Sequence, residues 1–361
     1  MPIPTQRDLE QARKTLTGWV AGQLPGAIEL ELSEVTGPAF TGFSNETLMF
    51  DATWIAADGR PRQQGMVVRV KPTGHTVFLE SEFEVQYRIM EILGRETDVA
   101  VPALIGFEED ATLLGAPFFV MDKVEGRIPT DDPPYHTGGW LTEVAPAERQ
   151  SIWWSGLEAM ARVHRLDWRQ LGLEFLDKPA RGRPGLEQQL RYYEEYFDWA
   201  KQGQANPVAE AALAWITANA PGRDEPVGLC WGDARIGNMI FQDGACVAVL
   251  DWEMVTLGNP VQDLAWWLFL DRHHSEGMSV ERLAGFPSHA DTVARWQELT
   301  GYDASPEMLV FYEIFAAFRF AVVMQRLGRM IIDSGLLPED SDFGINNTVT
   351  TLLARSLERQ T

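Results

Sequence analysis

Apolar positions along the first 125 residues alternate between two spacings. Apolar residues recur at helical intervals in two stretches, 5–23 and 79–93. Stretches rich in β-branched and aromatic residues, separated by Gly and Pro, predict strands in 28–56 (two strands joined by a glycine-containing turn), 65–72, 103–108 and 117–124. This order predicts a small lobe of mixed sheet and helix.

The pattern changes after 125–139, a stretch rich in Gly, Pro and Asp that is typical of a linker. A strand-rich patch at 228–252 interrupts an otherwise helical pattern, with helices predicted over 147–170, 186–203, 207–219 and 307–327. The predicted fold class is therefore α+β, with a small mixed lobe followed by a larger, mainly helical one. A length of 361 residues is also typical of two domains.

The charge of the chain excludes several classes of partner. Thirty Lys and Arg against 52 Asp and Glu give a net charge of −22. Such a surface repels nucleic acid and anionic membranes, whose binding depends on Lys and Arg. Any phosphate chemistry must therefore gather positive charge locally.

The apolar stretches favour a chain that does not enter membranes. The first twenty residues lack the apolar core of a signal peptide. The most apolar long stretch, Leu309–Leu327, contains Glu313 and Arg319, which favours a buried helix over a membrane span. We therefore expect a cytoplasmic protein.

Candidate chemistry is concentrated in residues 229–253, LCWGDARIGNMIFQDGACVAVLDWE. Asn238 follows Asp233 by five positions, and Asp251 follows Asn238 by thirteen. The two apolar runs between Asn238 and Asp251 are joined by Asp-Gly, a hairpin turn signal. A hairpin brings its ends together, so Asn238 and Asp251 are expected side by side, with Asp233 on the loop just before them.

Two oxygen ligands beside a free carboxylate suit phosphoryl transfer. Mg²⁺ prefers oxygen ligands and leaves part of its shell to phosphates, while the third carboxylate accepts the proton of the attacking hydroxyl. The catalytic loop of protein kinases spaces its Asp and Asn in the same way. Two alternatives are ordinary turn residues and a glycosidase pair, Asp233 with Asp251 or Glu253. The glycosidase alternative leaves Asn238 and the small N-terminal lobe unexplained.

The segments WGDARIGN and LDWEMVTLGNPVQDLAWW resemble the aminoglycoside phosphotransferase and choline-kinase-like family, in particular its branch fused to acyl-CoA dehydrogenases. The resemblance extends over about residues 30–330. It implies a protein-kinase-like fold with a nucleotide-binding lobe at 1–121, a hinge at 122–126 and a catalytic and substrate lobe at 127–361. It also implies phosphorylation of a small-molecule hydroxyl with ATP or GTP and Mg²⁺.

The resemblance assigns roles to the residues of the motif. Asp233 matches the catalytic base, and Asn238 and Asp251 match the Mg²⁺ ligands. The chain departs from the family at Trp231, where His is common. That His is usually supportive, so the departure leaves the expected activity in place.

Nucleotide-binding positions follow from the same resemblance. Ser44, with Asn45 beside it, matches a loop that touches the β-phosphate. In VVRVKP, strand alternation places Arg69 and Lys71 on one face. The resemblance aligns Arg69 with the strand Lys that holds the α- and β-phosphates, and whether Arg69 or Lys71 holds them is left open. The pattern alone is also compatible with a hairpin turn and a solvated edge.

The helix after this strand and the predicted hinge complete the nucleotide site. A helix Glu normally orients the phosphate cation; charge favours Glu82 and motif alignment favours Gln86, and we choose Glu82. The segment FFVMDKVEG resembles the hinge, where the Asp122 carbonyl and the Val124 N–H would face adenine with Met121 behind the ring.

The acceptor side is less defined. His164, in MARVHRLDW, is expected to be structural rather than catalytic. The aromatic face of 191–199 is compatible with a substrate wall, but core packing is favoured. A buried Arg in the late helix, Arg319 or Arg326, needs a partner, either Asp263 or an anionic substrate group.

Two kinds of small-molecule acceptor compete, a hydroxylated acyl-CoA and an aminoglycoside-like or macrolide antibiotic. The rival function is a pseudokinase or interaction module that binds nucleotide without turnover. The oligomeric state is left open.

Overall fold

The computed structural model describes residues 7–37, 45–74, 76–222 and 224–360. The chain forms two compact units. The N-terminal unit comprises residues 1–95 and 101–125, and the C-terminal unit comprises residues 96–100 and 126–361. The change of unit after Glu125 falls within 122–126, the segment interpreted above as a hinge.

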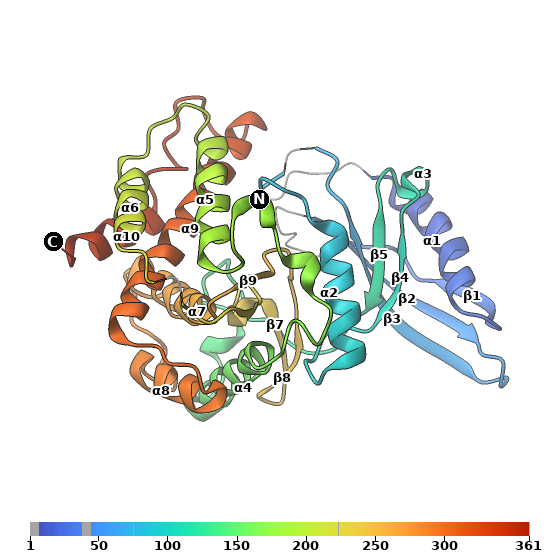
Figure 1. Cartoon of the computed structure of the whole chain (residues 1–361). Helices are drawn as coiled ribbons and strands as arrows, with labels where there is room; N and C mark the ends of the chain where they lie inside the picture. The colour runs from blue at the N-terminus through green and yellow to red at the C-terminus, as the bar shows by residue number, and fades with distance from the viewer. Residues whose placement is uncertain (1–6, 38–44, 75, 223, 361) are drawn as a thin grey trace. The chain divides into compact units, whose positions relative to one another are not determined.

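The N-terminal unit is built on a five-stranded antiparallel sheet in the order β1-β2-β3-β5-β4 (Figure 1). Its strands are β1 (Ile28–Leu32), β2 (Glu46–Ile55), β3 (Pro61–Val70), β4 (Leu104–Glu108) and β5 (Phe118–Asp122). Its helices are α1 (Leu9–Gln23), α2 (Phe83–Glu96) and α3 (Ala111–Leu114). All of these lie within or close to the predicted stretches except α3, a short helix that the pattern did not predict.

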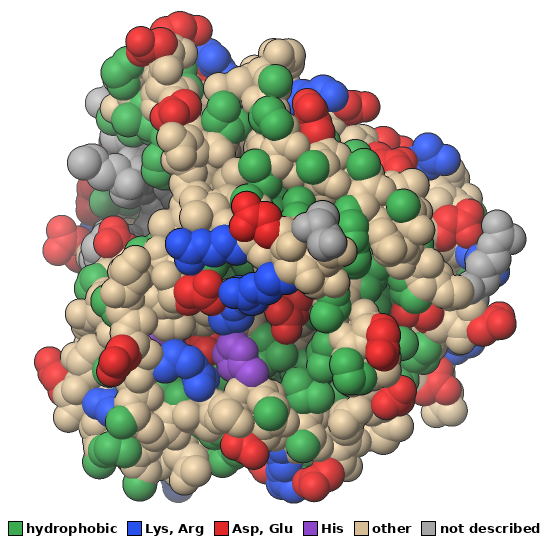
Figure 2. Space-filling model, turned by 90° about the vertical axis from the view of Figure 1, so that its left-hand side faces the viewer, with side chains coloured by type: hydrophobic (Ala, Val, Ile, Leu, Met, Phe, Trp, Pro, Cys, Tyr) green, Lys and Arg blue, Asp and Glu red, His purple; other side chains and the backbone are tan. Residues whose placement is uncertain are grey.

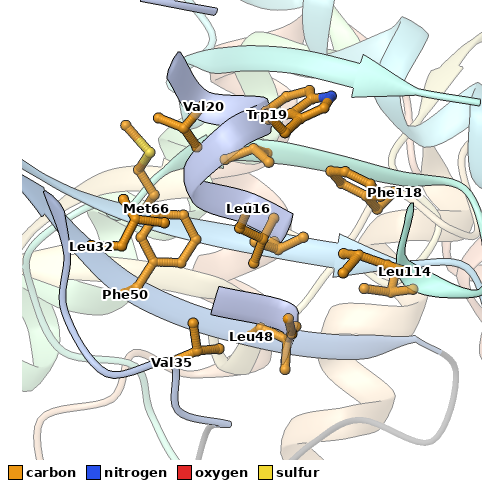
Figure 3. Packing of buried hydrophobic residues seen from close by; sticks show 14 of the residues in the cluster. Leu16, Trp19, Val20, Leu32, Val35, Leu48, Phe50, Met66, Leu114 and Phe118 are labelled. Atoms are coloured by element: carbon orange, nitrogen blue, oxygen red, sulfur yellow. The ribbon is translucent and has the colours of Figure 1, made fainter. Parts of the chain in front are cut away.

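One face of this sheet is covered by α1 (Figure 3). Leu16 and Val20 are fully buried against the sheet, and the Trp19 ring packs edge-on against Phe118 at 5.2 Å. Burial of these apolar side chains provides the main stabilisation of the unit. The α1 face is therefore closed to a ligand.

The opposite face carries α2 and the charged position Arg69. Phe83 of α2 packs against Phe119 of β5, with ring centroids 5.2 Å apart. Arg69 pairs with Thr47 on one neighbouring strand and with Phe119 on the other. Since residues opposite one another share a face, Arg69 lies on the α2 face, while Val68 and Val70 are buried on the α1 face.

The C-terminal unit is mainly helical and contains two small two-stranded sheets (Figure 1). Its α-helices are α4 (Pro146–His164), α5 (Leu186–Lys201), α6 (Pro207–Ala218), α7 (Val261–His274), α8 (His289–Thr300), α9 (Pro306–Asp333) and α10 (Thr348–Glu358). Strands β6 (Gly228–Cys230) and β9 (Thr256–Gly258) pair, as do β7 (Met239–Gln242) and β8 (Ala245–Val249). Short 3₁₀ turns occupy Trp140–Thr142, Glu174–Leu176, Pro179–Arg181, Ile236–Asn238 and Glu276–Met278.

Helix α9 forms the centre of this unit. The Phe315 ring packs against Tyr193 of α5, and the Phe318 ring packs against Phe197 of α5. The ring centroids are 5.7 Å apart in each pair. These contacts agree with the core-packing interpretation of the aromatic stretch 191–199. Among the described residues, no helix combines the length and apolarity needed to cross a membrane.

Helix α4 is shorter than the pattern predicts, ending at His164 rather than near 170. The Asp167 side chain accepts hydrogen bonds from the backbone N–H groups of Arg169 and Gln170, at 3.0 and 3.3 Å. Such a local turn competes with helix formation. The apolar spacing continues past this point, but the turn chemistry decides the end of the helix.

Candidate active site

The loop after β6 carries Asp233 and is anchored to helix α7. Asp263 of α7 is fully buried and accepts the backbone N–H groups of Trp231, at 2.6 Å, and Gly232, at 3.1 Å. Gly232 has a φ of 97°, and a Cβ there would lie 2.0 Å from the Met254 carbonyl oxygen. Only glycine fits this turn, which brings the next residue, Asp233, into a defined position.

His164 supports the same anchor. Trp296 donates its indole N–H to His164 Nδ1 at 2.9 Å, so the proton of a neutral imidazole is on Nε2. Nε2 lies 3.1 Å from Asp263 Oδ2 and donates to it. His164 thus orients the residue that anchors the loop, which is the structural role expected from the sequence.

Three side chains hold the carboxylate of Asp233. Trp266 Nε1–H donates to Oδ1 at 2.7 Å, and Asn238 Nδ2 donates to Oδ2 at 2.6 Å. Arg235 Nε bridges both oxygens, at 3.1 and 3.0 Å. A carboxylate has about four lone-pair sites, two on each oxygen, so these contacts on both oxygens orient the group.

The β7–β8 hairpin joins Asn238 to the region of Asp251. Met239 pairs with Val249, and the Leu250 N–H donates to the Asn238 carbonyl at 2.8 Å. The structure therefore places Asn238 next to the segment of Asp251, as the hairpin pattern predicts. Asp251 has a φ of 57°, which is costly for a residue other than Gly and has to be held by its surroundings.

Trp231 helps to hold that conformation. Its indole N–H points to the carbonyl oxygens of Leu250, at 2.8 Å, and Asp251, at 3.2 Å. The residue is fully buried. Where the family commonly has His, this chain uses an indole to connect the Asp233 loop with the Asp251 segment.

Asn238 and Asp251 have the chemistry of a Mg²⁺ site. The side-chain nitrogen of Asn238 donates to Asp233, which leaves Oδ1 of Asn238 as the atom for a metal. Asp251 adds a carboxylate. In the described part of the chain, no group of three or more His, Cys, Asp or Glu could hold a metal by itself. Two oxygen donors fit an ion that takes its other ligands from phosphates and water.

Arg235 belongs to the site although the sequence analysis did not select it. It donates to Asp131 as well as to Asp233. Burial disfavours its charge, but the two carboxylates outweigh burial and raise the pKa of Arg235. A cation two residues after a candidate base, in a chain of charge −22, was the available signal.

Arg319 has a different partner from the one expected. The sequence predicted Asp263 or an anionic substrate group as the partner, whereas Arg319 Nη2 donates to the Gly232 carbonyl at 3.1 Å. Its guanidinium also lies over the Trp266 ring, 4.7 Å from the centroid. The acids of the core are already engaged with backbone N–H groups, so ring faces and a carbonyl surround this cation.

The predicted phosphate-binding residues lie in the N-terminal unit. Ser44 falls outside the described residues, and Asn45 is buried just before β2. Arg69 Nη1 is 3.3 Å from the Thr47 hydroxyl, whereas Lys71 Nζ pairs with Glu84 at 2.7 Å. Both cations are half-buried, as the strand alternation indicates.

The alternatives for the helix partner are both near the start of α2. Glu82 is half-buried directly before the helix, and its carbonyl accepts the N–H of Gln86 at 3.2 Å. Gln86 is buried, with 6% of its surface exposed. Glu84, which the sequence analysis did not weigh, is the residue that pairs with Lys71.

The predicted hinge residues occupy the end of β5. Met121 pairs with Val67 and therefore shares the α2 face with Phe119. Asp122 donates its N–H to the Ala103 carbonyl at 2.8 Å, and its carboxylate accepts from Gln64. Val124 follows Lys123, whose N–H donates to the Gly65 carbonyl at 2.8 Å.

Residues 50–299 match the phosphotransferase enzyme family (APH), so the chain belongs to this family. It is 29% identical over 273 residues to the probable acyl-CoA dehydrogenase IBR3 of Arabidopsis thaliana, covering 71% of this chain and 32% of the relative. It is 28% identical over 312 residues to acyl-CoA dehydrogenase family member 11 of Rattus norvegicus, covering 82% and 37%. The chain therefore spans about a third of the length of these relatives.

Solved structures share its fold. A putative aminoglycoside phosphotransferase from Ralstonia eutropha aligns with a TM-score of 0.67 at 23% identity, over 96% of this chain and 95% of that one. A GDP and kanamycin complex of an aminoglycoside phosphotransferase aligns with a TM-score of 0.58 at 14% identity, over 96% of this chain and 99% of that one. An AMP-PNP and hygromycin B complex of another aminoglycoside phosphotransferase has a TM-score of 0.53 at 13% identity, over 95% of this chain and 98% of that one. The chain has the protein-kinase-like, two-lobed α+β fold predicted from its sequence.

Proposed function

We propose that this protein transfers the γ-phosphoryl group of ATP to a hydroxyl group of a small molecule. The observation that carries the proposal is the carboxylate of Asp233, oriented by side-chain donors and followed by the hairpin that joins Asn238 to the segment of Asp251. Membership of a phosphotransferase family supports the same reaction. GTP is the alternative donor, since fold relatives were solved with AMP-PNP and with GDP.

In the proposed reaction, the oxygen of the acceptor hydroxyl attacks the γ-phosphorus, and Asp233 accepts the proton of that hydroxyl. The bond from phosphorus to the bridging oxygen breaks, and ADP leaves with that oxygen. Such transfers depend mainly on positioning and charge neutralisation. The hydrogen bonds from Trp266, Asn238 and Arg235 supply the positioning of the base.

Asn238 Oδ1 and the Asp251 carboxylate are the proposed Mg²⁺ ligands. When bound, Mg²⁺ would supply positive charge to the phosphate oxygens. Trp231 keeps the Asp251 backbone in its left-handed conformation through the indole N–H. Asn238 is oriented by its own donation to Asp233.

Residues of the N-terminal unit are proposed to bind the nucleotide. Arg69 is the preferred phosphate cation because the resemblance aligns it with the strand cation of the family, whereas Lys71 is paired with the carboxylate of Glu84. We keep Glu82 as the orienting acid, with Gln86 and Glu84 as alternatives. Ser44 and Asn45 are proposed for the phosphates. The Asp122 carbonyl and the Val124 N–H are proposed for adenine, with Met121 behind the ring.

The acceptor is proposed to be a hydroxyacyl-CoA-like molecule or an aminoglycoside-like one. The names of the curated relatives favour the first, and those of the fold relatives favour the second. On the face shown in Figure 2, Lys and Arg side chains gather beside Asp and Glu. With small molecules as partners and ATP as donor, we place the reaction in the cytoplasm.

An ADP-release screen tests the proposal. Purified protein with ATP and Mg²⁺ is given hydroxyacyl-CoAs, aminoglycosides and macrolides in turn, with Asp233→Asn as the matched control. We expect ADP release only with one acceptor class and its loss in the variant. Nucleotide binding without turnover for any acceptor would favour the pseudokinase alternative, and equal turnover by Asp233→Asn would refute the assigned base.

A further inference from the structure

Helix α7 places an indole directly on the proposed base. Trp266 is buried, and its Nε1–H donates to Asp233 Oδ1 at 2.7 Å, across 33 positions of sequence. The hydrogen bond is charge-assisted, which makes it stronger and more directional than a neutral one. The indole therefore controls the orientation of the carboxylate.

Arg319 of α9 lies against the same indole. Its Cζ is 4.7 Å from the Trp266 ring centroid, and its Nη2 donates to the carbonyl of Gly232, the residue before Asp233. The rings of Tyr193 and Phe315 enclose it further, at 5.1 and 5.8 Å. One side chain thus touches both the backbone that carries the base and the indole that orients it.

The surroundings of Arg319 are unfavourable for a residue with a purely structural role. Only 1% of its surface is exposed, and within the described part of the chain Nε and Nη1 have no hydrogen-bond partner. Within these described residues, Arg319 also forms no salt bridge with a carboxylate. Burying a cation in this way costs free energy, and an apolar residue of similar volume often stabilises a protein more.

Arg149 of α4 shows the contrasting arrangement. It is also buried, but it donates to three backbone carbonyls, those of Leu141, Thr142 and Ala284, at 2.6 to 2.9 Å. Its charge is spread over several acceptors that tie loops together. The two arginines therefore make opposite predictions for stability.

We propose that Trp266 and Arg319 form a positioning pair for Asp233. Arg319 holds the Gly232 carbonyl and the indole plane, and Trp266 in turn holds Oδ1 of the carboxylate. The carboxylate of Asp233 is thereby held in a fixed orientation for the acceptor hydroxyl. Both residues act through Asp233, and the inference rests on the phosphotransfer function proposed above.

The first test compares two neighbouring tryptophans. Trp266→Phe removes the N–H that reaches Asp233, whereas Trp267→Phe removes an equally buried indole N–H that has no partner among the described residues. We expect kcat to fall about 10- to 100-fold in Trp266→Phe, as for a misplaced reacting group, with KM for ATP within about twofold of the wild type. Trp267→Phe should keep kcat within about twofold. Equal activity of the two variants would overturn the proposal.

The second test compares the two buried arginines. In Arg319→Met we expect kcat to fall about tenfold while the melting temperature stays the same or rises. Arg149→Met should lower the melting temperature and leave kcat unchanged. Arg319→Lys, which keeps a donor for Gly232, should recover part of kcat. A lower melting temperature with unchanged kcat in Arg319→Met would show a structural role only and overturn the proposal.

A double variant tests whether the pair acts as one unit. Because both residues are proposed to act through Asp233, combining Trp266→Phe with Arg319→Met should reduce kcat by less than the product of the two single losses. Multiplied losses would show independent roles and contradict the pair.

A measurement without turnover keeps the proposal separate from the proposed function. The Trp266 indole N–H resonance, assigned by its loss in Trp266→Phe, should shift in Asp233→Asn and in Arg319→Met but not in Arg149→Met. If no acceptor is turned over, the phosphotransfer proposal fails while this test still decides the pair. An unchanged Trp266 resonance in Arg319→Met would overturn it.

Discussion

The loop of Asp233 and the strand of Arg69 hold their charges in different ways. Asp233 accepts hydrogen bonds from an indole, an amide and a guanidinium, on a loop anchored to the buried Asp263. Arg69 and Lys71 are half-buried on a sheet face, beside a hydroxyl and a partly exposed carboxylate. The carboxylate site is prebuilt, whereas the cations hold contacts that a ligand can replace.

This difference has a physical reason. A base must be aimed before the reaction, since a small misplacement is costly in rate. A phosphate-binding cation needs only proximity and charge, and exposed ion pairs are weak enough to exchange for a triphosphate. Substitutions in the loop should therefore damage rate, and substitutions on the strand should damage nucleotide affinity.

The largest effect is expected for Asp233→Asn. Loss of the base should lower kcat by about 10²- to 10⁴-fold, the usual contribution of general base catalysis. ATP affinity, measured by titration calorimetry, should stay close to that of the wild type. A variant that instead loses ATP binding and keeps its rate at saturation would place Asp233 in nucleotide binding.

Asp251→Asn should act on the metal requirement. Replacing one of two proposed oxygen ligands is expected to raise the Mg²⁺ concentration for half-maximal activity about 10- to 100-fold. The readout is ADP release across a Mg²⁺ titration. Trp252→Phe is the matched control, because this buried neighbour donates its indole N–H to Val249 rather than to Asp251. An unchanged Mg²⁺ titration in Asp251→Asn would remove it from the metal site.

The C-terminal unit should lose stability in acid through its buried histidines. Burial lowers the pKa of His274 to about 3, against the partial opposition of Asp131. In the unfolded chain the His274 imidazole binds a proton below about pH 6.5, whereas in the folded chain it stays neutral at that pH. The free energy of unfolding therefore falls as the pH falls. Between pH 7 and pH 5 this amounts to about 2 kcal/mol, or about 25-fold in the folding equilibrium.

Denaturant unfolding at pH 7 and pH 5 checks this expectation. His274→Gln, which does not titrate, should show a smaller loss between the two pH values than the wild type. His273, whose pKa is lowered to about 4 by burial, should retain its own share of the loss. The same pH dependence in both proteins would contradict the role assigned to His274.

The smallest effect is expected on the strand. Arg69→Ala should raise KM for ATP about tenfold, equivalent to about 1.4 kcal/mol, with kcat changed much less. Lys71→Ala should raise the KM less, because the resemblance assigns the phosphates to Arg69 and Lys71 would have to leave Glu84 to reach them. A larger effect of Lys71→Ala would reverse the assignment of the phosphate cation.

Some of the site follows directly from local sequence. The spacing of Asn238 and Asp251 around an Asp-Gly turn determines a hairpin, and the structure has it. Strand alternation determines that Val68 and Val70 face the core while Arg69 does not. The end of α4 was predicted too late, because apolar spacing carries no information on the side-chain turn at Asp167.

Local sequence pattern thus determined most of the helices and strands, the hairpin, and the choice of Asp233, Asn238 and Asp251 as the motif residues. Tertiary structure alone decided what surrounds them. Trp266 and Asp263 reach the Asp233 loop from 33 and 32 positions away, Arg319 from 87, and Asp131 reaches Arg235 from 104. Turn and strand preferences act over a few residues, whereas these contacts depend on how α7 and α9 pack, which no short stretch of sequence encodes.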